Sequence, residues 1–81
     1  MYIEFRLPQG AGGMAAGHAL YLIKQDIHNW VERYSVTDYK TKIHKYTFRL
    51  CLATDKDYTS FALTWNPTHS ASQNFKFVNP K

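Results

Sequence analysis

Hydrophobic and polar residues alternate at the start of the chain. The apolar positions are Ile3, Phe5 and Leu7, and the positions between them are Tyr2, Glu4 and Arg6. This period of two predicts a half-buried β-strand over residues 2–7. Pro8 ends the strand, because proline has no backbone N–H to donate to a strand ladder.

The period then changes to steps of three and four residues. Apolar side chains recur at Ala16, Leu20, Ile23, Ile27, Trp30 and Tyr34. This spacing places them in one stripe along an α-helix, and the charged residues of the segment fall mainly off the stripe. We therefore predict an amphipathic helix over residues 13–34.

Three later segments favour strands. Residues 39–53, 58–65 and 75–78 are rich in β-formers and alternate again. We expect a hairpin connection at Asp55, Lys56 and Asp57. The side chains expected to face the core are Tyr46, Phe48, Leu50, Leu52, Phe61, Leu63, Trp65, Phe75 and Phe77.

Together these segments predict a single α+β domain over residues 1–81 with the order β-α-β-β-β. In this arrangement one long amphipathic helix packs on one face of a mostly antiparallel four-stranded sheet, and every apolar stripe is buried at once. The pattern leaves the order of the strands in the sheet open.

A single helix covers one face of the sheet, so the alternation also defines an uncovered face. Its expected side chains are Tyr2, Glu4, Arg6, Lys45, Thr47, Arg49, Tyr58, Ser60, Thr64, Lys76 and Val78. Four of them are cations against one carboxylate, and the two tyrosine rings offer surfaces on which bases stack. This composition favours contact with nucleic acid. The alternative is a solvated sheet face.

The densest positive stretch contains Lys40, Lys42, Lys45 and Arg49 within ten residues. Lys40 and Lys42 fall on the same side of an extended strand and repel each other unless an anion lies nearby. The stretch is therefore a candidate phosphate-binding strand. The alternative is an edge strand on which lysines prevent aggregation.

Charge and composition agree with a binding protein. Ten Lys and Arg against six Asp and Glu give a formal net charge of +4, which favours anionic partners. Cys51 is the only cysteine, so a disulfide scaffold is excluded. The start of the chain has no signal-peptide pattern and no apolar run spans a membrane, so we expect a cytoplasmic protein, in the host cytoplasm if it is viral.

A glycine-rich segment, residues 10–15, fits the pattern G-x-G-x-x-A between a strand and a helix. The chain is too short for a dinucleotide-binding domain, and no Lys-Ser or Lys-Thr follows, so a P-loop is excluded. The segment is expected to be a loop that starts the helix. The backbone amides of Gly12, Gly13 and Met14 form a weak candidate anion site.

No catalytic or metal-binding pattern is present in the sequence. Cys51 lies between apolar residues of a predicted strand, where nothing lowers the pKa of its thiol. His44 is about 23 Å from it along an extended strand, too far for a base. The four histidines have no zinc-ligand spacing. We expect a protein that is not an enzyme and has no cofactor or metal.

The first hypothesis is thus a small, basic, non-enzymatic protein that binds nucleic acid, RNA rather than DNA, as part of a nucleoprotein or alone. The expected contact residues are Tyr2, Arg6, Lys40, Lys42, Lys45, Arg49, Tyr58 and Lys76. The second hypothesis is a protein-binding inhibitor or regulator of a larger macromolecule, of the viral accessory type, which acts through the sheet edge or face. A homodimer with two sheets packed face to face is compatible with both.

Overall fold

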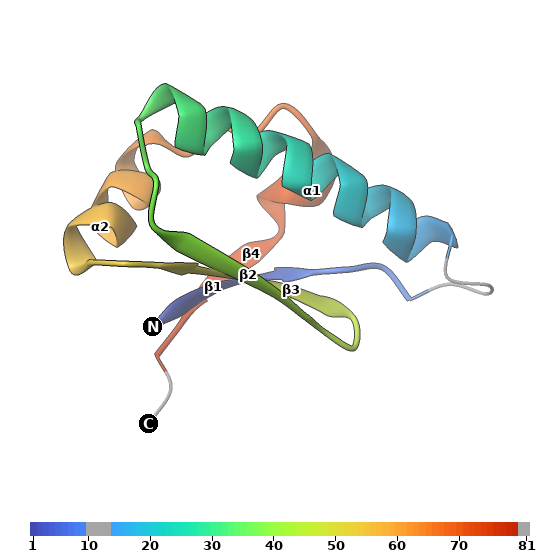
Figure 1. The fold of residues 1–81 in the computed structure, drawn as a ribbon. Helices are drawn as coiled ribbons and strands as arrows, with labels where there is room; N and C mark the ends of the chain where they lie inside the picture. Colours follow the sequence, from blue (N-terminus) through green and yellow to red (C-terminus); the bar gives the residue numbers. More distant parts are fainter. Residues whose placement is uncertain (10–13, 80–81) are drawn as a thin grey trace.

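The computed structural model describes residues 1–9 and 14–79. The elements are β1 (Tyr2–Arg6), α1 (Met14–Arg33), β2 (Tyr39–His44), β3 (Thr47–Leu52), α2 (Asp55–Thr64), a 3₁₀ helix (Ser70–Gln73) and β4 (Phe75–Val78), as Figure 1 shows. The α+β class is confirmed, with one long helix on a four-stranded sheet.

The four strands form one antiparallel sheet in the order β2-β3-β1-β4. β1 and β2 both pair antiparallel with β3, so they run parallel to each other with β3 between them. This is the split β-α-β order. The first and last strands of the chain lie side by side, and the β2–β3 hairpin extends the sheet on the other side of β1.

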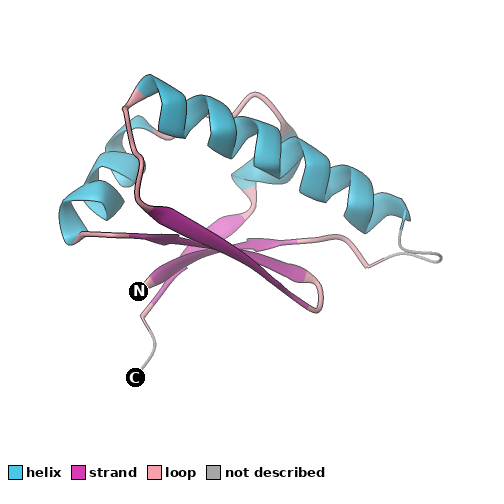
Figure 2. Cartoon of the chain, in the orientation of Figure 1, coloured by secondary structure: helices cyan, strands magenta, loops and turns pink. Residues whose placement is uncertain are grey.

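Both helices lie on the same side of the sheet (Figure 2). On that side, the rings of Phe5 and Phe61 contact Trp65 at 5.8 Å and 4.6 Å between centroids. The core is a single cluster that joins the sheet to α1 and α2. Its fully buried large apolar side chains are Ile3, Phe5, Ile23, Phe48, Leu50 and Phe61.

The helix predicted from the apolar stripe is confirmed as α1. Ile23, Ile27 and Trp30 are buried, as expected, whereas Tyr34 follows the end of the helix and is 40% exposed. The Trp30 indole N–H donates a hydrogen bond of 2.9 Å to Thr64 Oγ1 and so links α1 to α2.

The prediction of one strand over residues 39–53 was wrong, because the segment folds back on itself. Lys45 and Tyr46 form a two-residue turn between β2 and β3. Lys45 has φ 54°, the left-handed region that glycine occupies most easily. Neither turn residue is a typical turn former, so the sequence pattern does not mark the turn. Tyr46, expected in the core, is 45% exposed.

The strand predicted over residues 58–65 is helix α2. Its first turn contains Asp55 and Asp57, which were expected to form a hairpin connection. Thr54 caps the helix, since its Oγ1 accepts a hydrogen bond from the Asp57 N–H at 3.2 Å. Phe61 is fully buried, but Leu63, which strand alternation placed in the core, is 81% exposed.

The last predicted strand is confirmed as β4, which pairs with β1. Phe75 packs on the core, as expected. Phe77 lies opposite Ile3 on the same face of the sheet, yet it is 42% exposed because it sits at the sheet edge, where fewer neighbours cover it.

Candidate nucleic-acid interface

The face of the sheet that points away from both helices is uncovered in the described part of the chain (Figures 1 and 2). We call it the outer face and the opposite one the inner face. The register of the strands assigns to the outer face Tyr2, Glu4, Arg6, Lys40, Lys42, His44, Thr47, Arg49, Cys51, Lys76 and Val78.

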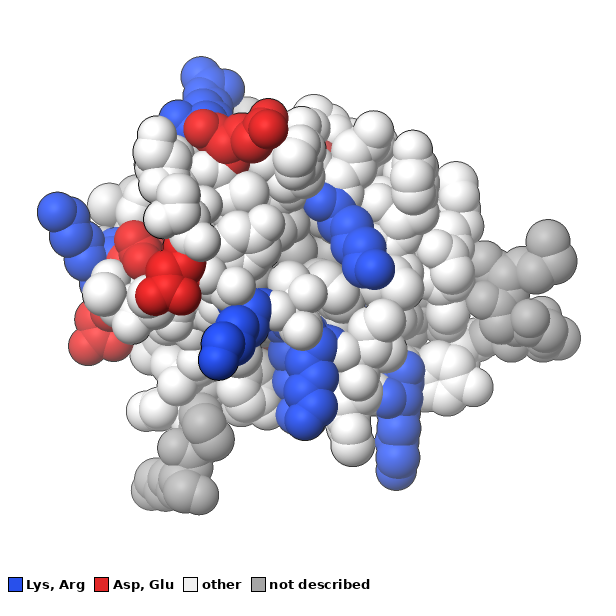
Figure 3. Space-filling model, in the orientation of Figure 1, with Lys and Arg blue, Asp and Glu red and all other residues white. Residues whose placement is uncertain are grey.

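The outer face carries most of the charge imbalance of the protein. Among the described residues it has five cations and one carboxylate, a net of +4, which equals the formal net charge of the chain. The other five Lys and Arg residues balance the other five Asp and Glu residues. In Figure 3, several Lys and Arg side chains project from the lower centre of the molecule, where no acidic side chain is seen, whereas the upper and left parts of the view show basic and acidic side chains together.

One row of side chains crosses all four strands of the outer face. The cross-strand partners place Lys42 beside Arg49, Arg49 beside Glu4, and Glu4 beside Lys76. One Glu4 carboxylate oxygen lies 3.8 Å from Arg49 Nε and the other lies 3.5 Å from Lys76 Nζ. The single carboxylate thus sits between two cations at the centre of a basic surface.

Arg49 also stacks on an aromatic ring. Its guanidinium carbon lies 4.8 Å from the centroid of the Tyr2 ring. Its Nε is buried and makes no hydrogen bond. A planar cation over a ring extends the flat surface that a nucleobase can stack on, because bases stack on arginine planes as well as on aromatic rings.

Two further rows flank the central one. Lys40 pairs with Cys51 on one side, and His44 pairs with Thr47, which pairs with Arg6, on the other. The cations are therefore spread over the face, with about 4.8 Å between neighbouring strands and about 6.7 Å between alternate residues of one strand.

Two of the expected contact residues are not on this face. Lys45 lies in the turn at the tip of the hairpin, not on a strand. Tyr58 lies on α2 and is only 7% exposed. Its hydroxyl donates to the Met1 carbonyl and accepts from the Leu52 N–H. Burial raises the pKa of the Tyr58 hydroxyl. Tyr58 therefore fastens α2 to the sheet and offers no ring to a ligand.

Two more residues assigned to the uncovered face, Ser60 and Thr64, lie on α2. The Thr64 hydroxyl donates to the Ser60 carbonyl at 2.6 Å. In the candidate anion site at the start of α1, Gly12 and Gly13 lie outside the described residues, as does the side chain of Met14.

A buried polar cluster has no signal in the sequence pattern. Asp26 is 4% exposed, and its carboxylate accepts hydrogen bonds from the Thr68 hydroxyl at 2.7 Å and from the backbone N–H groups of Thr68 and His69 at 3.2 Å. His69 Nδ1 lies 3.1 Å from one of the two carboxylate oxygens. Helical periodicity places Asp26 off the apolar stripe, where an exposed side chain is expected.

The pKa of Asp26 follows from opposing effects. Burial raises it, and contacts with Ser72, Thr68 and His69 lower it more, so the net pKa lies below the ordinary value of 3.8. The Ser72 hydroxyl is near enough to favour the charged form, although its Oγ makes no hydrogen bond of standard geometry. The ionised carboxylate thus ties the segment before β4 to α1.

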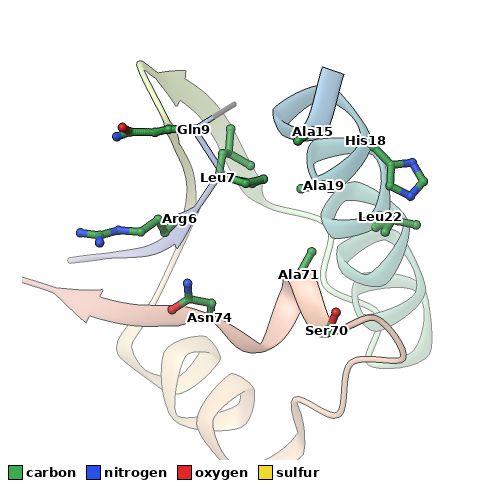
Figure 4. Close-up of a pocket in the computed structure, with 11 residues that line it drawn as sticks. Arg6, Leu7, Gln9, Ala15, His18, Ala19, Leu22, Ser70, Ala71 and Asn74 are labelled. Carbon is green, nitrogen blue, oxygen red and sulfur yellow. The ribbon is translucent and has the colours of Figure 1, made fainter. Parts of the chain in front are cut away.

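A hollow of about 780 Å³ lies between the start of α1, the end of β1 and the 3₁₀ helix (Figure 4). Leu7, Ala15, Ala19 and Ala71 supply apolar walls. The Arg6 side chain extends away from α1, toward the outer face. His18 also lines the hollow, but the described lining contains no Asp or Glu, so no carboxylate lies there to act with the imidazole.

The described residues hold no group of three or more His, Cys, Asp or Glu side chains that fits a metal ion. The hairpin brings His44 beside Thr47, which is four residues from Cys51 along β3, about 13 Å. The two side chains are nearer than on one continuous strand but still too far apart for proton transfer.

Within residues 1–9 and 14–79, neither α1 nor α2 combines the length and the apolar character needed to span a bilayer. Comparison with models of protein families, with curated proteins and with solved structures finds no match.

Proposed function

We propose that this protein binds single-stranded RNA through the outer face of its sheet. The observation that supports this proposal is the location of the charge. Five cations and one carboxylate lie on a surface left bare by both helices, while the remaining charges of the chain cancel. Each phosphate that meets a cation releases counterions, which is the main source of affinity for nucleic acid.

The stacked pair Arg49–Tyr2 supports a ligand with accessible bases. Unpaired bases stack on aromatic rings and guanidinium groups, whereas bases in a duplex are stacked on each other. Four strands span about 15 Å, and cations lie on all four. A single strand that crosses the sheet can therefore place its phosphates near lysines while one base stacks at the centre.

The test compares two variants with the same net charge. In the face variant, Arg6, Lys40, Lys42 and Lys76 are replaced by Gln. In the control variant, Lys24, Arg33, Lys45 and Lys56 are replaced by Gln. Both changes lower the formal net charge from +4 to 0, but only the first removes cations from the outer face. Affinity for a fluorescein-labelled oligo-U strand is measured by anisotropy at several salt concentrations.

For the unmodified protein we expect a slope of log K against log salt of about −3, since four phosphate contacts contribute about −0.7 each on a single strand. The face variant should lose most of this slope and the control variant should keep it. Equal losses in the two variants would show that only the overall charge matters and would contradict the proposal. A matched duplex should bind more weakly, and a DNA strand of the same sequence tests the preference for RNA.

Stacking is tested separately. Tyr2→Ala should weaken binding by about 1–3 kcal/mol, the usual contribution of a stacked base. Tyr21→Ala is the control, because Tyr21 is 63% exposed on α1, the helix that covers the opposite side of the sheet. Equal affinity of the two variants would exclude Tyr2 as a stacking surface.

A further inference from the structure

Strand β2 differs from the other strands in its exposure. Every residue from Lys40 to His44 is exposed, and Tyr39 is half-buried. β3 lies on one side of β2, and no strand of the described residues lies on the other. The free edge therefore presents backbone N–H and C=O groups to which another extended chain can add by hydrogen bonds.

The two faces of β2 differ in chemistry. The outer-face residues are Lys40, Lys42 and His44, and the inner-face residues are Tyr39, Thr41 and Ile43. Ile43 is 51% exposed although it points to the same side as the core. A strand added beside β2 would thus have cations beside it on one face and apolar or neutral side chains on the other.

A cleft lies beside the inner face of this edge. It has a volume of about 190 Å³ between α1 and the hairpin and is lined by Lys24, Ile27, His28, Tyr39, Thr41 and Phe48. Ile27 and Phe48 belong to the buried core, so the base of the cleft is apolar. An apolar side chain of an added strand that points to the inner face can enter it.

We propose that the free edge of β2 binds an extended segment of a partner protein in which acidic and apolar residues alternate. The acidic side chains would pair with Lys40 and Lys42 on the outer face. The apolar side chains would cover Ile43 and enter the cleft beside Tyr39. This inference does not rest on RNA binding, because the free backbone edge, the inner face and the charge of Lys40 and Lys42 carry it whether or not RNA binds.

The charges of β2 argue against a second copy of this chain as the occupant. If the β2 strands of two copies paired edge to edge, the outer-face lysines of one would lie among those of the other. Like charges opposite each other in a sheet are destabilising. An acidic strand replaces this repulsion by attraction, so the charge pattern selects the acidic partner.

The experiment uses three capped heptapeptides and the full chain. One alternates Glu and Val, one alternates Lys and Val, and one has the Glu and Val residues of the first in two blocks. Binding is measured by amide shifts in NMR titrations. We expect the alternating Glu–Val peptide to bind at least about tenfold more tightly than the other two, from cross-strand charge pairs and inner-face contacts, with the largest shifts in residues 39–44.

Exchanging the charges on β2 gives a test in which the expected result is a gain of binding, and a variant that fails to fold cannot produce that gain. Lys40→Glu with Lys42→Glu should reverse the preference, so that the Lys–Val peptide binds more tightly. Arg33→Glu with Lys56→Glu makes the same change in net charge elsewhere and should keep the Glu–Val preference. Three results would overturn the proposal. The first is equal affinity for the alternating and the block peptides, and the second is amide shifts located away from β2. The third is a dimer, seen by sedimentation, whose formation depends on β2.

Discussion

The inner and outer faces of the sheet are made by the same four strands, yet they have opposite roles. Ile3, Phe5 and Leu50 on the inner face are completely buried, whereas their neighbours in sequence, Glu4 and Arg49, lie on the outer face among charged groups. A shift of one position along a strand thus separates residues that stabilise the fold from residues available to a ligand. Substitutions on the inner face should therefore lower the free energy of unfolding, and substitutions on the outer face should change the affinity for a ligand.

The largest expected effect is on the inner side. Phe61→Ala removes a fully buried ring that stacks on Trp65 at 4.6 Å and contacts Trp30 and Phe75. We expect the free energy of unfolding to fall by about 3–5 kcal/mol, because the cavity cannot close completely. Urea denaturation followed by tryptophan fluorescence measures it. Leu63→Ala, on the same helix but 81% exposed, should change stability by no more than about 0.5 kcal/mol.

Asp26→Asn should have the second-largest effect, on the polar contact between α1 and the segment before β4. The free energy of unfolding should fall by about 1.5–3 kcal/mol. The neutral amide oxygen accepts weaker hydrogen bonds than the carboxylate, and the new NH₂ group would face the N–H and O–H donors of Thr68 and His69. Chemical denaturation at neutral pH measures this change. Asp38→Asn, at an exposed position before β2, makes the same change in net charge and is the control.

The pH dependence of Asp26 has a definite sign. Its pKa in the folded protein is below the unfolded value of 3.8, so its contribution to stability is present above that value and is lost as pH falls through the folded pKa. The unmodified protein should therefore lose stability more steeply than Asp26→Asn on acidification below about pH 4. Parallel curves for the two proteins in this range would contradict the role assigned to the carboxylate.

Lys45→Gly tests the turn at the tip of the hairpin, which belongs to neither face. Because φ is 54° at this position, glycine removes backbone strain, and we expect a gain in stability of about 0.5–1 kcal/mol. Tyr46→Gly, at the other turn residue, has no such strain to relieve and should not stabilise. Thermal unfolding measures both. RNA affinity should change little in Lys45→Gly, as the turn lies outside the outer face.

Glu4→Gln gives the smallest expected effect on stability and the clearest one on the proposed ligand. Its ion pairs with Arg49 and Lys76 lie at 3.8 and 3.5 Å at the sheet surface, so the loss in stability should be below about 1 kcal/mol. Affinity for single-stranded RNA should rise, because two cations lose their competing carboxylate. A decrease in affinity would indicate that Glu4 itself contacts the ligand.

Much of the proposed interface follows from alternation alone. Because side chains alternate along a strand, the pattern predicts Tyr2, Arg6, Arg49 and Lys76 on the uncovered face, and the strand register agrees. The same pattern misplaces Tyr58, because a short segment with mixed apolar spacing fits a strand and a helix almost equally well. The capping pattern from Thr54 to Asp57 is the signal that favours a helix there.

The sequence by itself determined the first strand, predicted over residues 2–7 and observed as Tyr2–Arg6, and the long helix with its buried stripe, since these depend on residues within a few positions of one another. Only the tertiary structure decided the strand order, the row from Lys42 to Lys76, and the contact of Asp26 with Thr68 and His69. These features join residues far apart in the chain. Their free energy comes from pairing and burial in the folded state, which no local pattern encodes.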